Sequence, residues 1–284
     1  MIPKANILTL AVLLIAAQLS LTQATGAATH AIFDLSRPAG VPFPSNAFTV
    51  VATENITGLR VNLPLPDCSA QPSDCDDLNV VNQMDGFNVQ ARLSIPFDSA
   101  IDPASVNNDT VFLVQFTSGA DDSRGRVVGV NQIVWDPRTN TLYAKSDEML
   151  EQHTSYALVV TSGVLDPNGH PVQPSAQFRR FREMAGRYRR ALEEGVRAAA
   201  HLGVAESRMV AVSVFTTQTV TAVLEKIRPQ LDSNVPTKAS FLLGADGSRT
   251  VFALNQIKGI AWNRPGSHAA GRHRASWHCS LFLG

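Results

Sequence analysis

The residues best suited to chemistry crowd into the end of the chain. The stretch "GSHAAGRHRASWHCSLFLG" carries three histidines, one cysteine and a serine beside a histidine: His268, His273, His278, Cys279 and Ser267. Imidazole and thiolate groups bind zinc, but histidines five residues apart point about 140° away from one another on a helix. In a strand, successive members of the series fall on opposite faces. This spacing argues against a metal site.

The serines nearest to a hydrolase motif do not complete it. A nucleophile elbow requires the pattern G-x-S-x-G at a strand-to-helix turn. "DGSRT" around Ser248 and "PGSHAAG" around Ser267 both lack the second glycine at the required place. We therefore predict no catalytic residue in this chain, and no cofactor-binding or metal-binding residue.

The first 28 residues have the pattern of a secretory signal peptide. Lys4 precedes the uncharged run "ILTLAVLLIAAQLSL", and small residues follow in "ATGAA". The run is shorter than the about 20 apolar residues of a membrane-spanning helix. We expect cleavage after Ala27 or Ala28 and export to the periplasm, the cell surface or the medium, with no membrane-spanning segment in the mature chain. An uncleaved anchor is the alternative.

Export determines how the paired cysteines are interpreted. Cys68 and Cys75 lie seven residues apart across a loop that contains proline, a separation that a turn can close. Disulfides persist in exported proteins, so we predict a bridge between these two residues. An acidic metal loop is the weaker alternative, because zinc sites show tighter cysteine spacing and histidine partners. Its carboxylates would be Asp67, Asp74, Asp76 and Asp77.

The formal net charge of zero hides a division of the chain. Residues 29–166 carry 17 acidic and 7 basic side chains, whereas residues 167–284 carry 7 acidic and 16 basic ones. Export, and the concentration of arginine on one predicted helix, argue against nucleic acid as the partner of the basic half. We expect the basic half to pack on the acidic half.

Composition and periodicity divide the mature chain into four regions. Residues 29–86 are a proline-rich lead-in, because proline confines strands to edges. Residues 87–175 alternate with period two in "FNVQARLSIPF" and continue as short apolar runs between turns, which predicts an antiparallel β-sandwich. Residues 176–262 form a smaller α/β accessory segment, and residues 263–284 form a disordered tail. The predicted fold class is mainly β.

Helical spacing begins after the sandwich. Apolar residues recur every three or four positions from Phe178 to Leu202, which predicts one long amphipathic helix, or two with a break near Gly186. The basic face of this helix would be solvated and pair with the acidic sandwich, or it would lie on anionic lipid. That face consists of Arg179, Arg180, Arg182, Arg187, Arg189 and Arg190.

The rest of the chain predicts two strands, a helix and a hairpin. "MVAVSVF" predicts a strand, followed by a helix that stops near Pro229, a hairpin around "GADG" and a strand in "GIAW". Thr216, Thr217 or Thr219 would cap that helix, or the first two would bind an anion at its N-terminus.

Several turns of the chain carry acidic or amide side chains, which would either bind calcium or only stabilise the turns. These residues are Asp98, Asp102, Asp121, Asp122, Asp166 and Asn168.

The sandwich region resembles a known module. The runs "LSIPFDSAIDPASVNNDTVFLV" and "SYALVVTSGVLDPNGHPV" match two motifs of bacterial Ig-like modules of the S-layer SbsA type. The resemblance implies an Ig-like sandwich and says little about function. The matching residues are Phe97, Ile101, Asp102, Pro103, Ser105, Val106, Tyr156, Leu158, Val160, Gly163, Val164, Asp166 and Gly169.

A wider resemblance covers most of residues 31–262. "FPSNAFTV", "YRRALEEGVRAAAHLG" and "SRTVFALNQIKGIAW" are similar to the N-terminal part of exported bacterial lipases and esterases, called virulence-factor lipase N-terminal. This resemblance implies a non-catalytic accessory region that positions or anchors an α/β-hydrolase domain, its expected partner.

That hydrolase domain is absent from this sequence, and the resemblance ends near Pro265. We therefore expect a truncated or frameshifted product without hydrolase activity. One alternative is a free-standing cell-surface binding or adhesion module, and another is that the segment after Pro174 is the incomplete start of the hydrolase domain.

Overall fold

The computed structural model describes residues 28–37, 39–117, 125–234, 257–263 and 278–283. It divides into two compact units, residues 1–223 and 224–284, and each unit is described by itself. The predicted signal peptide lies outside the described residues except for Ala28. Within the described part of the chain, no helix is both long and apolar enough to cross a membrane.

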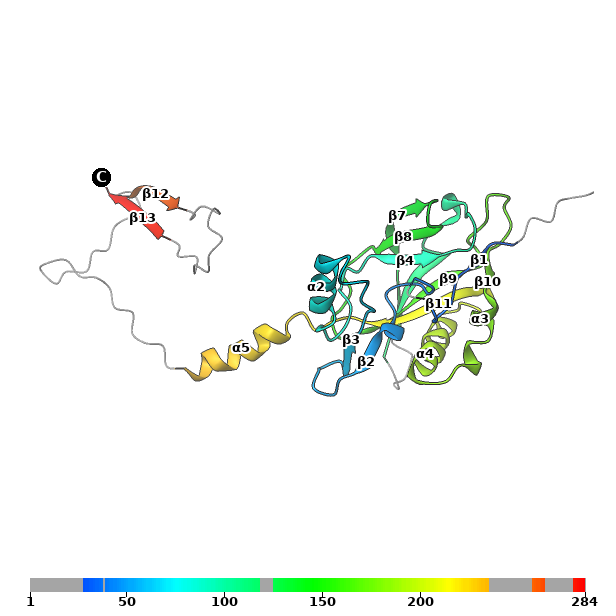
Figure 1. The fold of residues 1–284 in the computed structure, drawn as a ribbon, viewed down its shortest axis with the longest axis horizontal. Helices are drawn as coiled ribbons and strands as arrows, with labels where there is room; N and C mark the ends of the chain where they lie inside the picture. Colours follow the sequence, from blue (N-terminus) through cyan, green and yellow to red (C-terminus); the bar gives the residue numbers. More distant parts are fainter. Residues whose placement is uncertain (1–27, 38, 118–124, 235–256, 264–277, 284) are drawn as a thin grey trace, which may run out of the picture. The chain divides into compact units, whose positions relative to one another are not determined.

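The first unit contains two antiparallel sheets that face each other. One has the strand order β4-β8-β7, from Leu93–Pro96, Thr141–Ser146 and Val130–Asp136. The other has the order β11-β9-β5-β6, from Met209–Thr216, Ser155–Thr161, Val111–Phe116 and Arg126–Val128. Figure 1 shows the first sheet lying over the second. The predicted fold class is confirmed: the protein is mainly β, with an antiparallel Ig-like sandwich.

Alternating side chains of the two sheets form the first core. Ile95 and Leu142 of the three-stranded sheet and Leu113 and Leu158 of the four-stranded sheet are all fully buried in it. Successive residues of a strand point to opposite faces, so each sheet contributes every second side chain. The hydrophobic alternation in the sequence therefore becomes the inner faces of the sandwich.

A second core covers the other face of the four-stranded sheet. Here α4 (Arg187–His201) contributes Leu192 and Val196, which pack with Val159 of β9 and Val212 of β11. All eight residues of β11 are buried, because one face meets the sandwich core and the other meets α4. The unbroken apolar run of this strand follows from burial on both sides. The accessory segment thus supplies a strand and a helix to the sandwich itself.

The helical segment breaks at the predicted place. It comprises α3 (Ala176–Arg179), the 3-10 turn η4 (Phe181–Glu183) and α4, and Gly186 before α4 has a φ of 99°. Glycine adopts this left-handed conformation at little cost. The two-helix interpretation is therefore confirmed.

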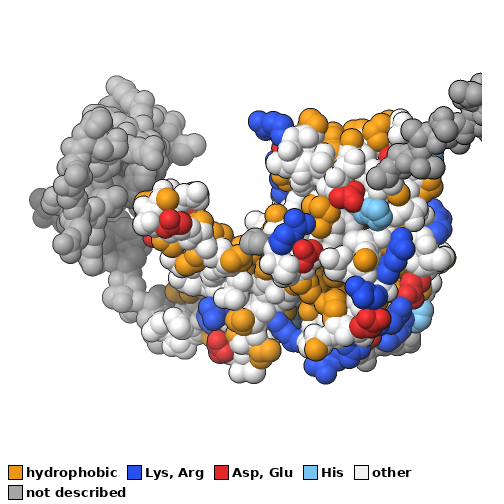
Figure 2. All heavy atoms as spheres, turned by 45° about the vertical axis from the view of Figure 1, so that its right-hand side comes forward, with side chains coloured by type: hydrophobic (Ala, Val, Ile, Leu, Met, Phe, Trp, Pro, Cys, Tyr) orange, Lys and Arg blue, Asp and Glu red, His pale blue; other side chains and the backbone are white. Residues whose placement is uncertain are grey.

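The ion pairs of this segment differ from the prediction. Arg182 pairs with Glu206 at 2.9 Å, and Arg189 pairs with Glu193 at 2.6 Å on the same helix. Both glutamates belong to the basic half, so these arginines do not use sandwich carboxylates as we had expected. Residues four apart on a helix are neighbours, which makes the second pair a local one. Figure 2 shows basic and acidic side chains interspersed over the face in view.

The lead-in is built into the first unit by short elements. It comprises β1 (His30–Ala31), which pairs in parallel with β10 (Gln173–Pro174), the 3-10 turn η1 (Asn46–Phe48), and an antiparallel hairpin of β2 (Thr49–Val51) and β3 (Leu59–Val61). The chain from the lead-in through β11 therefore lies in one compact unit, where the sequence predicted three successive regions.

The predicted disulfide between Cys68 and Cys75 is present. Cys75 lies in a helix that the sequence pattern did not predict, α2 (Pro72–Val81), and its side chain is buried. Pro72 begins this helix, where its missing N–H removes no intrahelical hydrogen bond. Among the described residues, no group of three His, Cys, Asp or Glu side chains could hold a metal ion.

The long strand predicted in "FNVQARLSIPF" is much shorter in the structure. Only β4, Leu93–Pro96, is a strand, while Phe87 forms an isolated bridge to Thr217. Between them the Asn88 side chain accepts a hydrogen bond from the backbone N–H of Gln90 at 2.8 Å. Such an asparagine turn competes with strand pairing, so the prediction was wrong for residues 88–92.

The second unit contains most of α5 and a two-stranded sheet. α5 (Ala222–Ser233) continues through Pro229, where the sequence predicted a stop. Proline removes one helical hydrogen bond, but its φ is compatible with a helix. β12 (Ile257–Asn263) confirms the predicted strand in "GIAW". The hairpin predicted around "GADG" lies outside the described residues.

The last part of the chain contains a strand where we had expected disorder. β13 (His278–Leu283) lies within the predicted disordered tail and pairs antiparallel with β12. The sequences of the two segments, "IKGIAWN" and "HCSLFL", are rich in apolar and aromatic residues, which are common in strands. The prediction of disorder for residues 263–284 is therefore corrected over β13.

Candidate functional site

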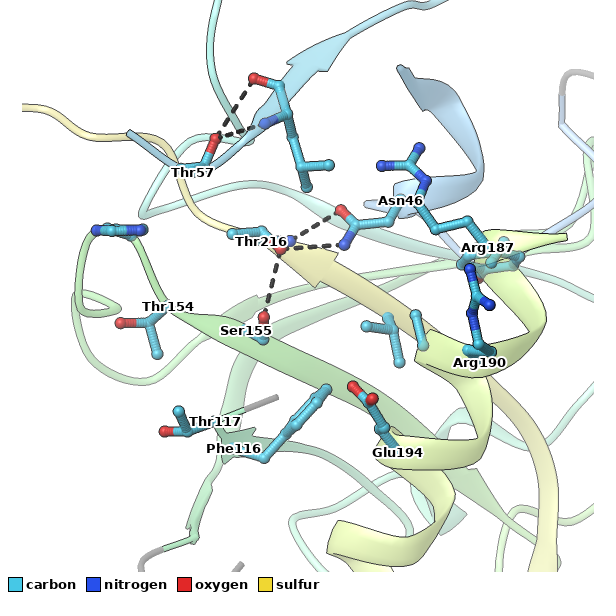
Figure 3. Close-up of a pocket in the computed structure, with 15 residues that line it drawn as sticks. Asn46, Thr57, Phe116, Thr117, Thr154, Ser155, Arg187, Arg190, Glu194 and Thr216 are labelled. Carbon is cyan, nitrogen blue, oxygen red and sulfur yellow. Dashed lines mark hydrogen bonds between the residues drawn. The ribbon is translucent and has the colours of Figure 1, made fainter. Parts of the chain in front are cut away.

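A pocket of about 480 Å³ opens in the first unit between the start of α4 and one end of the four-stranded sheet. The lead-in closes its third side through Asn46, Thr57 and Leu59, and the strands β5, β9 and β11 supply its floor. Figure 3 shows these elements converging on the pocket. Its volume lies within the range usual for small-molecule sites, about 300–1,000 Å³.

A fixed polar network forms one wall of the pocket. Thr216 ends β11 opposite Ser155, which begins β9, and their hydroxyl oxygens lie 3.4 Å apart. Asn46 donates from Nδ2 to Thr216 Oγ1 at 3.0 Å, while its Oδ1 accepts from the Thr216 backbone N–H at 3.0 Å. The two bonds hold the lead-in against the sheet, as the dashed lines in Figure 3 show.

Two guanidinium groups form the opposite wall. Arg187 and Arg190 lie three residues apart in the first turns of α4, so they share a face of the helix. Arg187 donates from Nη2 to the Thr49 carbonyl oxygen at 2.7 Å, and burial lowers the pKa of Arg187. Within the described residues, neither guanidinium has a carboxylate partner. As far as the described residues go, both can therefore pair with an anion.

A carboxylate and several hydroxyls complete the lining. Glu194 lies one turn beyond Arg190, and Figure 3 shows its carboxylate pointing toward the ring of Phe116. Thr57, Thr117 and Thr154 add hydroxyl groups around the rim. The pocket thus offers hydrogen-bond donors and acceptors on all sides.

The same lining gives little support to nucleophilic catalysis. Ser155 and His153 both line the pocket, but the Ser155 hydroxyl has Thr216 as its hydrogen-bond partner within the described residues. A serine nucleophile needs a base within hydrogen-bonding distance. The arrangement is suited to holding a polar ligand rather than to activating a hydroxyl.

The threonines of "TTQT" have other roles than the predicted ones. Thr217 is buried and donates to the Glu151 carbonyl oxygen at 2.6 Å, and Thr219 donates to Asp85 Oδ2 at 2.7 Å. Because α5 begins only at Ala222, the capping prediction for Thr216, Thr217 and Thr219 was wrong. Thr216 lines the pocket instead.

The acidic turn at Asp166 is closed by hydrogen bonds to its own backbone. Asp166 accepts hydrogen bonds from the N–H groups of Asn168 at 2.8 Å and His170 at 2.9 Å. These backbone bonds lower the pKa of Asp166, with the larger contribution from His170. The carboxylate thus closes a turn. Asp121 and Asp122 lie outside the described residues.

The reactive-looking residues of the last part of the chain belong to the second unit. His268, His273, Ser248 and Ser267 lie outside the described residues. His278 and Cys279 lie in β13. The sequence analysis had named three of the pocket residues as candidates for binding: Arg187 and Arg190 in the basic face, and Thr216 in the "TTQT" turn. Nothing in the sequence marked Asn46 and Ser155 as pocket residues, because their meeting depends on how the lead-in folds back onto the sheet.

The central part of the chain is similar to a known family. Residues 71–182 match the family model of a bacterial Ig-like domain. The Ig-like match begins next to α2, includes both sheets except β11, and ends in η4. β11 therefore joins the sheet of the Ig-like domain from outside the matched range. No curated protein matches the chain.

Two solved structures show a distant likeness. The S-layer protein SbsC, in a crystal structure and in a structure of its domains 1–6, is 12% identical to this chain with a TM-score of 0.24. In each comparison the match covers 39% of this chain and 16% of the SbsC chain.

Proposed function

We propose that this protein is an exported, non-catalytic binding module of the bacterial cell envelope, built on an Ig-like domain. The pocket beside α4 carries this proposal. It combines two guanidinium groups that lack carboxylate partners within the described residues with a rim of hydroxyl and amide groups. Such convergent polar groups in a preformed pocket are typical of ligand binding.

A binding role agrees with the rigidity of the site. The pocket walls come from a buried sheet, from the first turns of α4 and from a lead-in fixed by the bonds between Asn46 and Thr216. Groups held in place before a ligand arrives lose little conformational entropy when it binds. The signal-peptide pattern supports export of the chain.

Sedimentation with isolated envelopes tests this function. Purified residues 29–284 should sediment with envelope fractions, and a variant with Arg187→Ala and Arg190→Ala should remain in the supernatant. Arg197→Ala, which changes an exposed arginine on the same helix, is the matched control. Equal sedimentation of all three proteins would contradict the use of this pocket, and no sedimentation of the wild type would contradict the function itself.

A second candidate is an accessory region that contacts a hydrolase domain, as the lipase resemblance implies. The apolar side chains of α5 favour it, because Val223, Leu224 and Leu231 are 67%, 67% and 68% exposed. Exposed apolar patches mark surfaces that other proteins cover. In this role the chain should not cleave a short-chain nitrophenyl ester by itself. Cleavage that disappears in Ser248→Ala or Ser267→Ala would refute both candidates.

A further inference from the structure

We propose that the pocket beside α4 binds a saccharide that carries a carboxylate, such as a uronic acid residue of an acidic polysaccharide. This inference rests on the proposed binding function and names its ligand class. The carboxylate would lie between Arg187 and Arg190, and the sugar hydroxyls would contact the polar rim. Three observations support this ligand class: the charge of the two arginines, the polar groups of the lining, and the volume of the pocket.

The two arginines select an anionic group. Guanidinium groups form two parallel hydrogen bonds with a carboxylate, and such charge-assisted bonds are stronger than neutral ones. Nη2 of Arg187 is bound to Thr49, which fixes the orientation of the guanidinium plane. Arg190 is exposed and has no carboxylate partner within the described residues. A ligand carboxylate supplies the partner that both groups lack.

The rest of the lining suits sugar hydroxyls. Each hydroxyl of a sugar both donates and accepts, so a saccharide site needs groups of both kinds. The Thr117 hydroxyl has no hydrogen-bond partner within the described residues and serves in either role. The hydroxyls of Thr57 and Thr154 already donate to backbone carbonyl oxygens and can still accept. The Glu194 carboxylate accepts, and the arginines donate. A site for a simple anion would need donors alone. Glu194, one turn along α4 from Arg190, adds an acceptor beside these donors, which favours a ligand with donors of its own.

Size and lining argue against two simpler ligands. A cavity of about 480 Å³ is far larger than a single phosphate or sulfate ion requires. An acyl chain would need apolar surface, but Phe116 and Val214 of the lining are only 4% and 1% exposed. Most of the residues that line the pocket have polar side chains.

Calorimetric titration of residues 29–284 tests the inference. The probes are digalacturonate, the neutral disaccharide galactobiose, and inorganic phosphate. Digalacturonate should bind, and galactobiose should bind at least about tenfold more weakly, the loss expected when a charge-assisted hydrogen bond is missing. Phosphate should not displace digalacturonate at equal concentration. Equal binding of galactobiose, or displacement by phosphate, would overturn the ligand class.

Variants locate the site. Arg190→Ala should weaken digalacturonate binding about tenfold or more, because it removes one guanidinium contact. Glu194→Gln should weaken it to a smaller extent, and Arg197→Ala should leave it unchanged. An unchanged affinity in Arg190→Ala, or an equal loss in Arg197→Ala, would overturn the site. A circular dichroism melt of each variant separates loss of binding from loss of folding.

The two proposals fail in different ways. If the wild type sediments with envelopes but does not bind digalacturonate, the saccharide inference is wrong and the envelope-binding function stands. If the wild type binds digalacturonate but does not sediment with envelopes, the pocket and its ligand class stand and the envelope role is wrong. Each experiment therefore decides one proposal without the other.

Discussion

Ser45 of the lead-in donates a hydrogen bond of 2.8 Å to the hydroxyl of Tyr188 on α4, although the two residues lie 143 positions apart. The same phenol lies 3.3 Å from Ser213 Oγ of β11. Burial raises the pKa of Tyr188, because the surrounding protein disfavours the charged phenolate. Lead-in, helix and sheet therefore meet at one buried hydroxyl. This contact explains why the regions that the sequence separated fold as one unit.

Tyr188→Phe should lower the free energy of unfolding by about 1–2 kcal/mol, because the buried hydroxyls of Ser45 and Ser213 each lose a partner. Urea denaturation checks this value. Tyr143→Phe is the matched control, because the Tyr143 hydroxyl of β8 has no hydrogen-bond partner within the described residues. Equal stability of the two variants would show that the phenol does not join these regions.

Gly195 sets the distance between α4 and the sheet. A Cβ at this position would lie 2.6 Å from Val214 Cγ2 and 3.1 Å from the Ala157 Cβ. Alanine normally stabilises a helix interior relative to glycine by about 0.5–1 kcal/mol. Gly195→Ala should instead destabilise the protein by about 1–3 kcal/mol through overpacking.

Thermal unfolding of a double-mutant cycle tests the close contact. Val214→Ala removes the methyl group that a Cβ at position 195 would meet, so it should recover part of the loss caused by Gly195→Ala. Additive effects of the two substitutions would mean that the helix does not press on this valine. A stabilising effect of Gly195→Ala alone would contradict the packing.

The sequence predicted the strands and the helix, because these elements depend on local patterns of apolar residues. Short apolar runs between turns identified β5, β7, β8 and β9, and the helical spacing identified α4 with its break at Gly186. It did not predict that β11 pairs with β9, because pairing partners depend on burial that only the folded chain provides. The pocket was missed for the same reason: Asn46 and Thr216 are 170 residues apart, and nothing local marks their meeting.

Removing the disulfide tests how firmly the loop before α2 is held. Cys68→Ala with Cys75→Ala should lower the free energy of unfolding by about 2–3 kcal/mol, the value for a short crosslinked loop. Cys75 is 4% exposed, so alanine avoids placing a hydroxyl in its buried position. Cys279→Ala should leave both the denaturation midpoint and the non-reduced peptide map unchanged. An equal loss in that control would mean that the bridge does not stabilise the first unit.

Acid should destabilise the protein partly through Asp166. The folded pKa of this carboxyl is lowered because the backbone N–H groups of His170 and Asn168 stabilise its charged form. Its contribution to stability is therefore fully present above the unfolded pKa of about 3.9 and is lost as the pH falls through the lower folded pKa.

Asp166→Asn should lower the melting temperature at pH 7 and reduce the further decrease on acidification below about pH 4, where the wild-type carboxylate becomes protonated. Differential scanning calorimetry at neutral and acidic pH measures both effects. Asp109→Asn is the control, because that exposed carboxylate accepts no hydrogen bond within the described residues. If Asp166→Asn keeps the full acid sensitivity of the wild type, other carboxyl groups account for it, and the turn at Asp166 does not contribute through its charge.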